Sequence, residues 1–272
     1  YKVIKPILVP TITYPFEWCF SQFKDAALLT LEILKQSLAK GMILKDASAY
    51  NVQFIEGKPI FIDTLSFEKY QEGTPWVAYK QFCQHFLAPL ALMSKVDIRL
   101  SLLLREHIDG IPLDLAGSLL PFKTKLSLGL ASHIHLHAKA QKKYSDSGMK
   151  SENAKISRHS LLALIDNLEG TINSLNLNLP KTAWGEYYED TNYSDEAHEY
   201  KKKLLNDYIS KIQPQKILDI GANTGIFSRI ASDQGIRTIA SDMDPVAVEK
   251  NYLRIKENKE SNILPIVLDL VN

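Results

Sequence analysis

The pattern of hydrophobic and polar positions changes twice along the chain and divides it into three segments. Residues 1–100 mix short apolar runs with helical spacing and aromatic side chains, which predicts an α+β segment. Residues 101–179 show mainly helical spacing, interrupted by prolines and by a polar stretch at 145–155 that predicts a loop. From residue 180 onward, an approach segment leads into a helix and then into alternating strands and helices.

The segment 180–272 has the periodicity of an α/β unit. Its first helix is predicted to begin near Ser194 and to end before Pro214, because the apolar positions between them recur at helical spacing. The elements predicted after it are a strand at 216–220, a helix at 226–233, a strand at 237–241, a helix capped by Asp244, and a strand at 263–268. This β-α-β-α-β order predicts parallel strands joined by right-handed crossovers.

Composition excludes several classes of protein. Hydrophobic residues make up 45% of the 272 positions and charged residues 23%, which is typical of a globular protein. No apolar run reaches the roughly 18 residues of a membrane span, and we expect no signal peptide at the start. The net charge of +1 gives no electrostatic signature for nucleic acid. Cys19 and Cys83 are too few for a disulfide framework or a zinc site, so we expect a reduced, cytoplasmic protein without a metal.

A tight glycine turn follows the strand at 216–220. Gly221 and Gly225 permit positive φ angles and let a ligand approach the backbone closely. The turn lies at the carboxyl end of the first parallel strand, where open α/β sheets bind ligands. Asp219 precedes the turn, at a place where a phosphate-binding loop would avoid negative charge. Its carboxylate suits a ligand with an ammonium group, such as the amino-acid end of S-adenosylmethionine.

Two more acids follow the next two strands. Asp242 ends the second strand about 20 residues after the glycine turn, the spacing at which an acid can accept hydrogen bonds from a ribose diol. Met243 comes next and could lie flat on a purine, while Asp269 could accept a hydrogen bond from an exocyclic amine. Acids at three successive strand ends therefore predict a pocket for an adenosyl group.

These motifs resemble those of class I S-adenosylmethionine-dependent methyltransferases. The matching pattern is Asp-x-Gly-x-x-x-Gly, then Asp-Met-Asp-Pro, then an Asp after the third strand. The resemblance implies a Rossmann-like fold, S-adenosylmethionine as the cofactor, and contacts from Asp219, Gly221, Ala222, Asn223 and Gly225 at the methionine end, Asp242 at the ribose, and Met243, Asp269 and Leu270 at the adenine. Asn223 stands where the family more often has Gly, and Asn tolerates the left-handed conformation.

The residues alone also allow another interpretation of the same turn, an α/β domain with a chance glycine turn and no nucleotide. A dinucleotide site is less favoured, because Gly-x-Gly-x-x-Gly is absent. An aromatic stretch at 184–193 precedes the predicted helix, and it either covers the cofactor or packs in the core.

The predicted sheet stops after its third strand. In class I methyltransferases the residues that bind the acceptor usually follow a fourth strand, so we expect the domain to be truncated and assign no catalytic residue. The methyl acceptor stays unidentified. We expect this fragment to be inactive and to bind S-adenosylmethionine weakly. The strand at 216–220 would form an open sheet edge through which two copies could associate.

The N-terminal segment carries a second motif. A helix predicted at 21–40 leads to Asp46, Asn51 and Asp63, with Gly57 at the turn of a predicted hairpin. This spacing resembles the catalytic loop and metal-binding Asp of kinase-like phosphotransferases, where one Asp orients the acceptor and the Asn and second Asp hold Mg²⁺. The flanking residues differ from that family, and no glycine-rich loop or strand lysine precedes them, so only a kinase-like C-lobe would be present. A degenerate kinase-like fold, an active phosphotransferase and coincidental spacing all stay open.

The stretches 45–67, 75–93 and 184–225 together resemble a nodulation-protein-like bacterial family of class I methyltransferases. The implied fold class is α/β, with a kinase-like α+β segment at 1–100, a helical region at 101–179 and a partial methyltransferase domain at 180–272. The implied function is transfer of a methyl group to an unidentified acceptor. The alternatives are a phosphotransferase or inert pseudokinase-like module, and a non-catalytic module that binds the acceptor.

His133, His135 and His137 alternate along the helical region. On a strand all three would share a face and could bind a metal, but the surrounding spacing is helical and pairs only His133 with His137. We therefore expect a helix surface here and no metal site. Cys83 and His85 lie two positions apart, so on a helix their side chains diverge and do not form a nucleophile pair.

Overall fold

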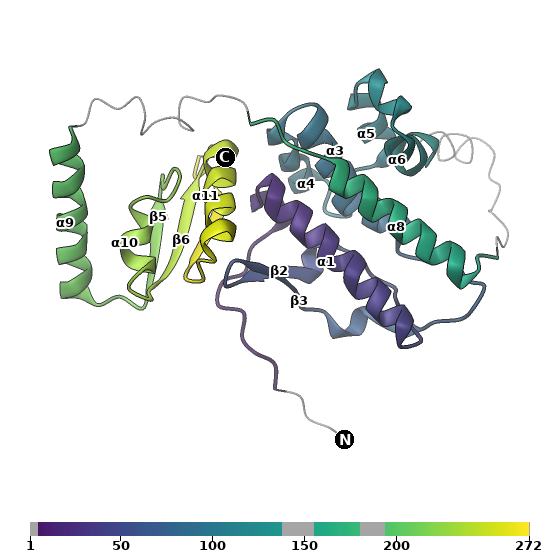
Figure 1. Ribbon diagram of the computed structural model, residues 1–272, viewed down its shortest axis with the longest axis horizontal. Coiled ribbons are helices and arrows are strands. Elements are labelled where there is room, and N and C mark those ends of the chain that lie inside the picture. The colour runs from purple at the N-terminus through teal and green to yellow at the C-terminus, as the bar shows by residue number, and fades with distance from the viewer. Residues whose placement is uncertain (1–4, 138–154, 180–193, 272) are drawn as a thin grey trace.

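The computed structural model describes residues 5–137, 155–179 and 194–271 (Figure 1). Its N-terminal part combines helices with two short antiparallel sheets, and its C-terminal part is a three-stranded parallel sheet with its helices. The mixed α/β class and the C-terminal parallel sheet were both predicted from the sequence and are confirmed. Within the described ranges, no helix combines the length and the apolar character that crossing a membrane requires.

The N-terminal part includes four strands and a series of helices. Its strands are β1 (Met42–Leu44), β2 (Val52–Ile55), β3 (Lys58–Phe61) and β4 (Phe67–Lys69). Its α-helices are α1 (Phe20–Ala39), α2 (Tyr79–Phe82), α3 (Ala88–Lys95), α4 (Leu103–Glu106), α5 (Leu113–Leu119), α6 (Leu128–Leu130) and α8 (Arg158–Ser174). The 3-10 turns are η1 (Pro15–Glu17), η2 (Ala49–Asn51), η3 (Thr64–Ser66), η5 (Ile98–Leu102) and η6 (Phe122–Leu126), and the π-helical turns are η4 (Cys83–Leu87) and η7 (Ala131–Leu136).

The C-terminal part begins with a long helix and continues through the parallel sheet. Its elements are α9 (Asp195–Ile212), β5 (Lys216–Ile220), α10 (Ser228–Ser232), β6 (Arg237–Asp242), α11 (Pro245–Asn258) and β7 (Ile263–Val267). The predicted strands agree with these bounds to within one residue. The predicted helix at 226–233 is shorter in the structure, because the chain from 224 to 227 still forms turns.

Helix α1 supplies the central apolar face of the N-terminal part, and its predicted bounds are confirmed to within one residue. Its buried face repeats every three or four positions and includes Phe23, Ala27, Leu31, Leu34 and Leu38. Burying the side chain of Phe23 or of one of the three leucines contributes roughly 1.5–3 kcal/mol to stability. The helix ends before Gly41, whose φ of 73° stops the helical path. Helix α8 packs along α1, as Figure 1 shows.

The predicted hairpin is also present. Strands β2 and β3 pair antiparallel with Ile55 opposite Lys58, which leaves Glu56 and Gly57 as a two-residue turn. Both turn residues have positive φ angles, 52° and 71°, as the tight turns favoured in twisted hairpins require. Because Glu56 is not a glycine, its left-handed conformation is held by the pairing on either side.

The C-terminal sheet has the strand order β5-β6-β7, with all neighbours parallel. In the described part of the chain β5 pairs only with β6, so it forms one edge of this sheet. Leu218 and Ile220 of β5 are 52% and 57% exposed, so this face of the edge strand is open. Parallel strands place their carboxyl ends at the same edge of a sheet, and this geometry positions the candidate site.

Helix α11 is shared by the two parts of the molecule. Val246, Val248 and Tyr252 belong to the large apolar core of the N-terminal part. Ile255, on the same helix, belongs to a small separate core inside the sheet, together with Ala222, Ala240 and Ile263. Figure 1 shows α11 between the sheet and α1. The sheet is therefore held to the N-terminal part through one of its own helices.

Candidate functional site

A pocket opens at the carboxyl ends of the parallel strands. Its volume is about 520 Å³, and it is formed by the ends of β5, β6 and β7 with the turn after β5. The predicted residues that line it are Asp219, Gly221, Ala222, Asn223, Asp242, Met243, Asp269 and Leu270. The structure thus brings all the predicted cofactor residues except Gly225 to one cavity.

The turn after β5 is built from residues in the left-handed conformation. Gly221 has a φ of 73° and Asn223 a φ of 52°, which agrees with the tolerance of Asn for this region. The backbone N–H groups of Gly221 and Ala222 both donate to the carbonyl oxygen of Ser241, at 2.9 Å each. These bonds tie the turn to the end of β6 and hold its backbone along the pocket wall.

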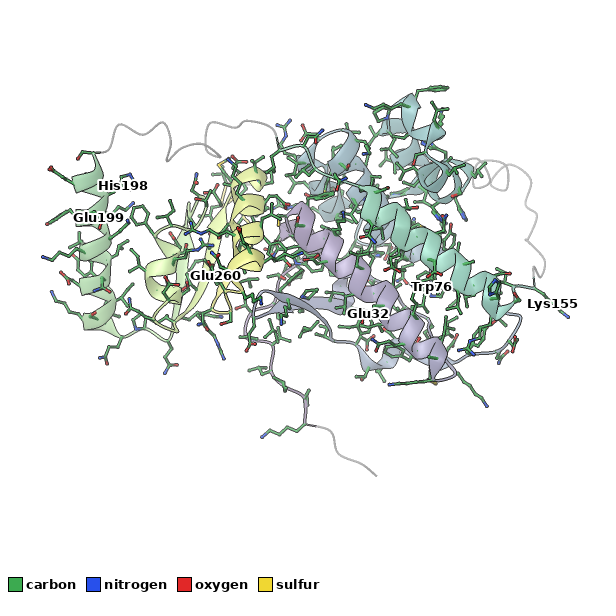
Figure 2. All side chains as sticks on the ribbon, in the orientation of Figure 1. Glu32, Trp76, Lys155, His198, Glu199 and Glu260 are labelled. Atoms are coloured by element: carbon green, nitrogen blue, oxygen red, sulfur yellow. The ribbon has the colours of Figure 1, made fainter. Side chains whose placement is uncertain are left out.

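Gly225 lies behind this turn, where the close packing of Asn251 and Arg229 leaves no room for a side chain. Its φ is 76°, and a Cβ atom at this position would lie 2.6 Å from Asn251 Nδ2 and 2.7 Å from Arg229 Nη1. The Arg229 guanidinium fills this space, because its Nη1 donates to the carbonyl oxygen of Thr224 at 2.9 Å and to that of Gly225 at 3.0 Å. Glu260, labelled in Figure 2, pairs with Arg229 at 2.9 Å. The turn is thus supported from below by a buried ion pair.

Asp219 and Asp242 are fixed in place by hydrogen bonds. Asp219 Oδ2 accepts a hydrogen bond from the buried hydroxyl of Ser228 at 2.6 Å. Asp242 is only 8% exposed, and its two carboxylate oxygens accept from the backbone N–H groups of Asn223 at 2.7 Å and of Asp244 at 2.9 Å. A carboxylate has about four acceptor positions, so each group keeps capacity for a ligand.

The end of the pocket near β7 combines a carboxylate with open apolar side chains. Asp269 Oδ1 accepts from the backbone N–H of Val271 at 2.9 Å. Met243 and Leu270 are 63% and 64% exposed, although both are apolar. Exposed apolar side chains next to a fixed acceptor form a surface on which a flat heterocycle with an amino group can lie.

The structure adds five lining residues that the sequence did not predict, Lys201, Ile220, Phe227, Leu268 and Val271, and two of them, Lys201 and Phe227, contact each other. Lys201 comes from α9, and its Nζ atom lies 4.0 Å from the centre of the Phe227 ring. The ring of His198 stacks on Phe227 at 5.9 Å with an interplanar angle of 10° (His198 is labelled in Figure 2). The spacing of His198 and Lys201, three residues apart on a predicted helix, was the available signal that both face the same way.

The kinase-like motif residues take part in local turns. Asn51 Nδ2 donates to Ser66 Oγ at 3.1 Å, and this hydroxyl donates to Asp63 Oδ2 at 2.5 Å. Asp46 Oδ1 accepts from Gln81 Nε2 at 2.8 Å. The structure therefore joins Asn51 and Asp63 through a shared serine, and it pairs Asp46 with α2.

The prediction of a helix surface at the alternating histidines is wrong for His133 and His135, which are 3% and 8% exposed. His133 accepts a hydrogen bond at Nδ1 from the Tyr79 hydroxyl at 2.6 Å and donates from Nε2 to Asn167 Oδ1 at 2.7 Å. Burial lowers the pKa of His133, which agrees with this neutral form. The π-helical turn η7 changes the angular positions that regular helical spacing predicts.

Within the described ranges, the His, Cys, Asp and Glu side chains outside this pocket do not assemble into a metal site. Among the described residues, no group of three His, Cys, Asp or Glu side chains is placed to hold a metal ion. The aromatic stretch at 184–193 lies outside the described residues. Cys83 and His85 both lie in the π-helical turn η4 and are buried, and burial raises the pKa of the Cys83 thiol to about 12. This thiol therefore stays protonated.

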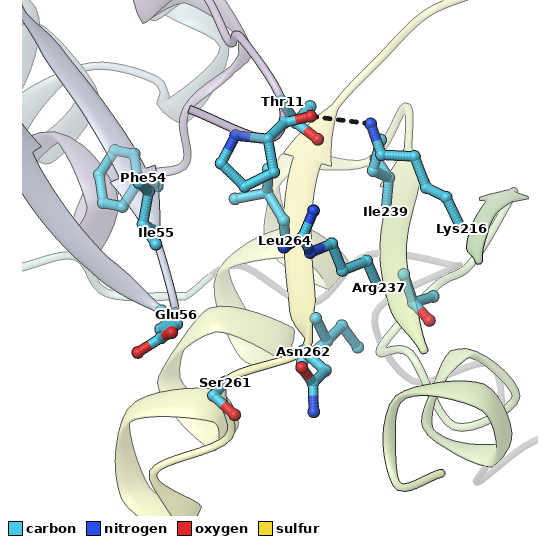
Figure 3. Close-up of a pocket in the computed structure, with 14 residues that line it drawn as sticks. Thr11, Phe54, Ile55, Glu56, Lys216, Arg237, Ile239, Ser261, Asn262 and Leu264 are labelled. Atoms are coloured by element: carbon cyan, nitrogen blue, oxygen red, sulfur yellow. Dashed lines mark hydrogen bonds between the residues drawn. The ribbon is translucent and has the colours of Figure 1, made fainter. Parts of the chain in front are cut away.

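A smaller cavity of about 150 Å³ lies near the amino ends of the strands (Figure 3). It is bounded by the hairpin turn at Glu56 and by Lys216 and Arg237 at the starts of β5 and β6. Lys216 Nζ donates to the carbonyl oxygen of Pro10 at 2.9 Å, which bridges the two parts of the molecule. This volume is below the roughly 300 Å³ that ligand pockets usually have, so we assign it no ligand.

Among known proteins, the chain is similar to the nodulation protein NoeA of Rhizobium meliloti (strain 1021). The two sequences are 34% identical over 278 residues, a match that covers 100% of this chain and 58% of NoeA. The chain thus spans somewhat more than half the length of this relative. No family model matches the chain, and no solved structure matches it. The similarity supports the resemblance to a nodulation-protein-like family, and the name of the relative gives no enzyme class.

Proposed function

We propose that the pocket at the carboxyl ends of β5, β6 and β7 binds S-adenosylmethionine, and that the protein takes part in transfer of its methyl group to an acceptor still to be identified. The observation that carries this proposal is that Asp219, Asp242 and Asp269 line one cavity. Asp219 lies one residue before the end of β5, Asp242 ends β6 and Asp269 follows β7. The backbone of the turn after β5 lines the same cavity.

The size and the charge of the pocket both suit this ligand. A volume of about 520 Å³ falls in the range of roughly 300–1,000 Å³ that small-molecule sites occupy. The three carboxylates would repel the phosphates of ATP or of a dinucleotide, whereas S-adenosylmethionine carries an ammonium and a sulfonium and no phosphate. In the proposed complex Asp219 binds the ammonium, Asp242 accepts from the ribose hydroxyls, and Asp269 with Met243 and Leu270 holds the adenine.

For methyl transfer, the main task of the protein is to position the cofactor and the acceptor. S-adenosylmethionine supplies an electrophilic methyl group, and an acceptor must approach it in line. Holding the two reactants in this orientation can account for much of the rate, because it removes the entropic cost of their encounter. The turn that presents Gly221 and Ala222 is fixed by hydrogen bonds to Ser241, so the pocket is formed before the ligand arrives.

The N-terminal part is proposed as the support for this site. Asp46, Asn51 and Asp63 each hold local structure, so no observation favours phosphotransfer as a second function. The contacts of α11 with α1 instead indicate that the N-terminal part fixes the sheet and its pocket.

Calorimetric titration with S-adenosylmethionine tests the proposal. The wild-type chain is expected to bind, and Asp242→Asn is expected to weaken binding by ~10- to 100-fold, because a charged acceptor is lost from a bound diol. The matched control is Asp233→Asn, which removes an exposed carboxylate after α10. Thermal unfolding of each variant shows whether the fold is kept. A folded Asp242→Asn variant with wild-type affinity, or a wild-type chain that binds nothing, would refute the assignment.

A further inference from the structure

The pocket presents a cation to the ligand as well as its three carboxylates. Among the described residues that line it, Lys201 is the basic one. It comes from α9, outside the strand ends and turns that hold the acids, and it contacts Phe227, which lines the same pocket as Asp219. A wall with acids and a separate cation is suited to a ligand that itself carries both charges.

The position of Lys201 is set by aromatic contacts and leaves its ammonium available. The Nζ atom lies 4.0 Å from the centre of the Phe227 ring, which attracts a cation through its negative face. Phe227 is in turn stacked by His198. The neighbouring Lys202 differs, because its ammonium pairs with Glu199 of the same helix at 2.6 Å. Lys201 is thus held at the pocket by an uncharged aromatic ring, which does not neutralise its positive charge.

We propose that Lys201 binds the α-carboxylate of the amino-acid end of S-adenosylmethionine while Asp219 binds the ammonium beside it. This inference rests on the proposed function and adds to it the residue that recognises the tail. The two charges of an amino acid sit on one carbon, so they need an acid and a base on the same side of the pocket. Asp219, at the end of β5, and Lys201, on α9 just before β5 in the chain, meet this requirement.

The pairing makes the pocket selective for the tail of the ligand. An adenosyl compound without the amino-acid end keeps the contacts of Asp242, Asp269 and Met243 but gains nothing from Lys201. An adenosyl compound with the full tail gains a charge-assisted hydrogen bond, which is stronger than a neutral one. Because Lys201 is exposed and solvent screens its charge, we expect a moderate effect on affinity of about tenfold.

The test compares two ligands on three variants. S-adenosylhomocysteine carries the complete amino-acid tail, and 5′-methylthioadenosine lacks it. Lys201→Met is expected to weaken binding of S-adenosylhomocysteine about tenfold and to leave 5′-methylthioadenosine unchanged, and Lys201→Arg should restore most of the loss because it keeps the charge. The control is Lys203→Met, an exposed lysine two positions along α9 that the helical twist turns away from the pocket.

Each outcome decides between the inference and the proposed function. If the wild-type chain binds neither ligand, both fail. If both ligands bind and Lys201→Met binds S-adenosylhomocysteine as the wild type does, the inference fails while the adenosyl site stands. If Lys201→Met weakens the binding of both ligands equally, the inference also fails. A contact with the amino-acid tail cannot affect the binding of 5′-methylthioadenosine, which has no tail. All three substitutions are on an exposed helix surface, so the fold is expected to persist.

Discussion

Ser21 and Glu249, 228 positions apart in the sequence, are joined by two hydrogen bonds at the first turn of α1. The backbone N–H of Ser21 donates to Glu249 Oε2 at 2.9 Å, and the Ser21 hydroxyl donates to Oε1 of the same carboxylate. Glu249 is 2% exposed and lies on α11. A carboxylate at this place satisfies a free helix N–H and opposes the positive end of the helix dipole.

Replacing Glu249 by Ala is expected to destabilise the protein by about 1–3 kcal/mol, because the part-buried N–H and hydroxyl of Ser21 would lose their acceptor. Urea-induced unfolding measures the change in free energy. The control is Glu257→Ala on the exposed face of α11, which should change stability by less than about 0.5 kcal/mol. Equal effects of the two substitutions would show that the contact with α1 contributes nothing.

Gly225→Ala and Gly170→Ala are expected to have opposite effects on stability. Gly225 has a φ of 76°, and its Cβ would overlap Asn251 and Arg229, so the substitution should cost roughly 1–3 kcal/mol. Gly170 lies inside α8 with open space around it, so Ala there should stabilise the helix by about 0.5–1 kcal/mol. Unfolding curves of both variants provide the comparison, and a neutral Gly225→Ala would mean that the turn can rearrange freely.

Stability is expected to fall as the pH drops from about 6.5 to 4 because of His85. Burial lowers the pKa of His85 to about 4, against the opposing influence of Asp46 and Asp109. Above pH 6.5 the His85 imidazole is neutral in both the folded and the unfolded protein. Between pH 6.5 and pH 4 it is protonated in the unfolded protein and stays mostly neutral in the folded one. With ~1.4 kcal/mol for each pKa unit, the loss at pH 4 amounts to about 3 kcal/mol.

The variant His85→Phe removes this titration and should show a smaller fall in unfolding free energy between pH 7 and about pH 4.5 than the wild type does. His159→Phe, at an exposed position in the first turn of α8, is the control and should keep the wild-type dependence. A His85→Phe variant with an unchanged pH profile would contradict the assignment to His85.

The part of the site that could be predicted from the sequence is the part that the parallel sheet determines. Asp219, Asp242 and Asp269 lie at or just past the carboxyl ends of three apolar strands, and parallel strands bring such positions to one edge whatever the rest of the chain does. The hairpin turn at Gly57 and the helix before Gly41 were predictable for a similar reason, since each depends on a few neighbouring residues.

The place of Lys201 at the pocket could not be predicted, because it depends on how far α9 is rotated against α10. Helical spacing shows which side chains share a face, but the packing of the helix decides what that face meets. The burial of His133 was missed because a π-helical turn shifts the register within a sequence whose spacing looks regular. The spacing of Asp46 and Asp63 likewise gave no sign that Asp63 binds within a local turn, or that Asp46 accepts from both the Ser48 backbone and Gln81 of α2.

Helix α11 contributes to both apolar cores, and this restricts how the sequences of the two parts can change in evolution. Val248 and Tyr252 face the core of the N-terminal part, while Ile255 faces the sheet and Asp244, at the start of the same helix, donates its N–H to Asp242 in the pocket. A substitution that changes the apolar face of α1 requires a compensating substitution on α11. A shift of α11 would in turn move Asp244 and the strand ends at the pocket. The two parts should therefore coevolve, and a recombinant that exchanges the sheet between relatives would have to carry the matching face of α1 with it.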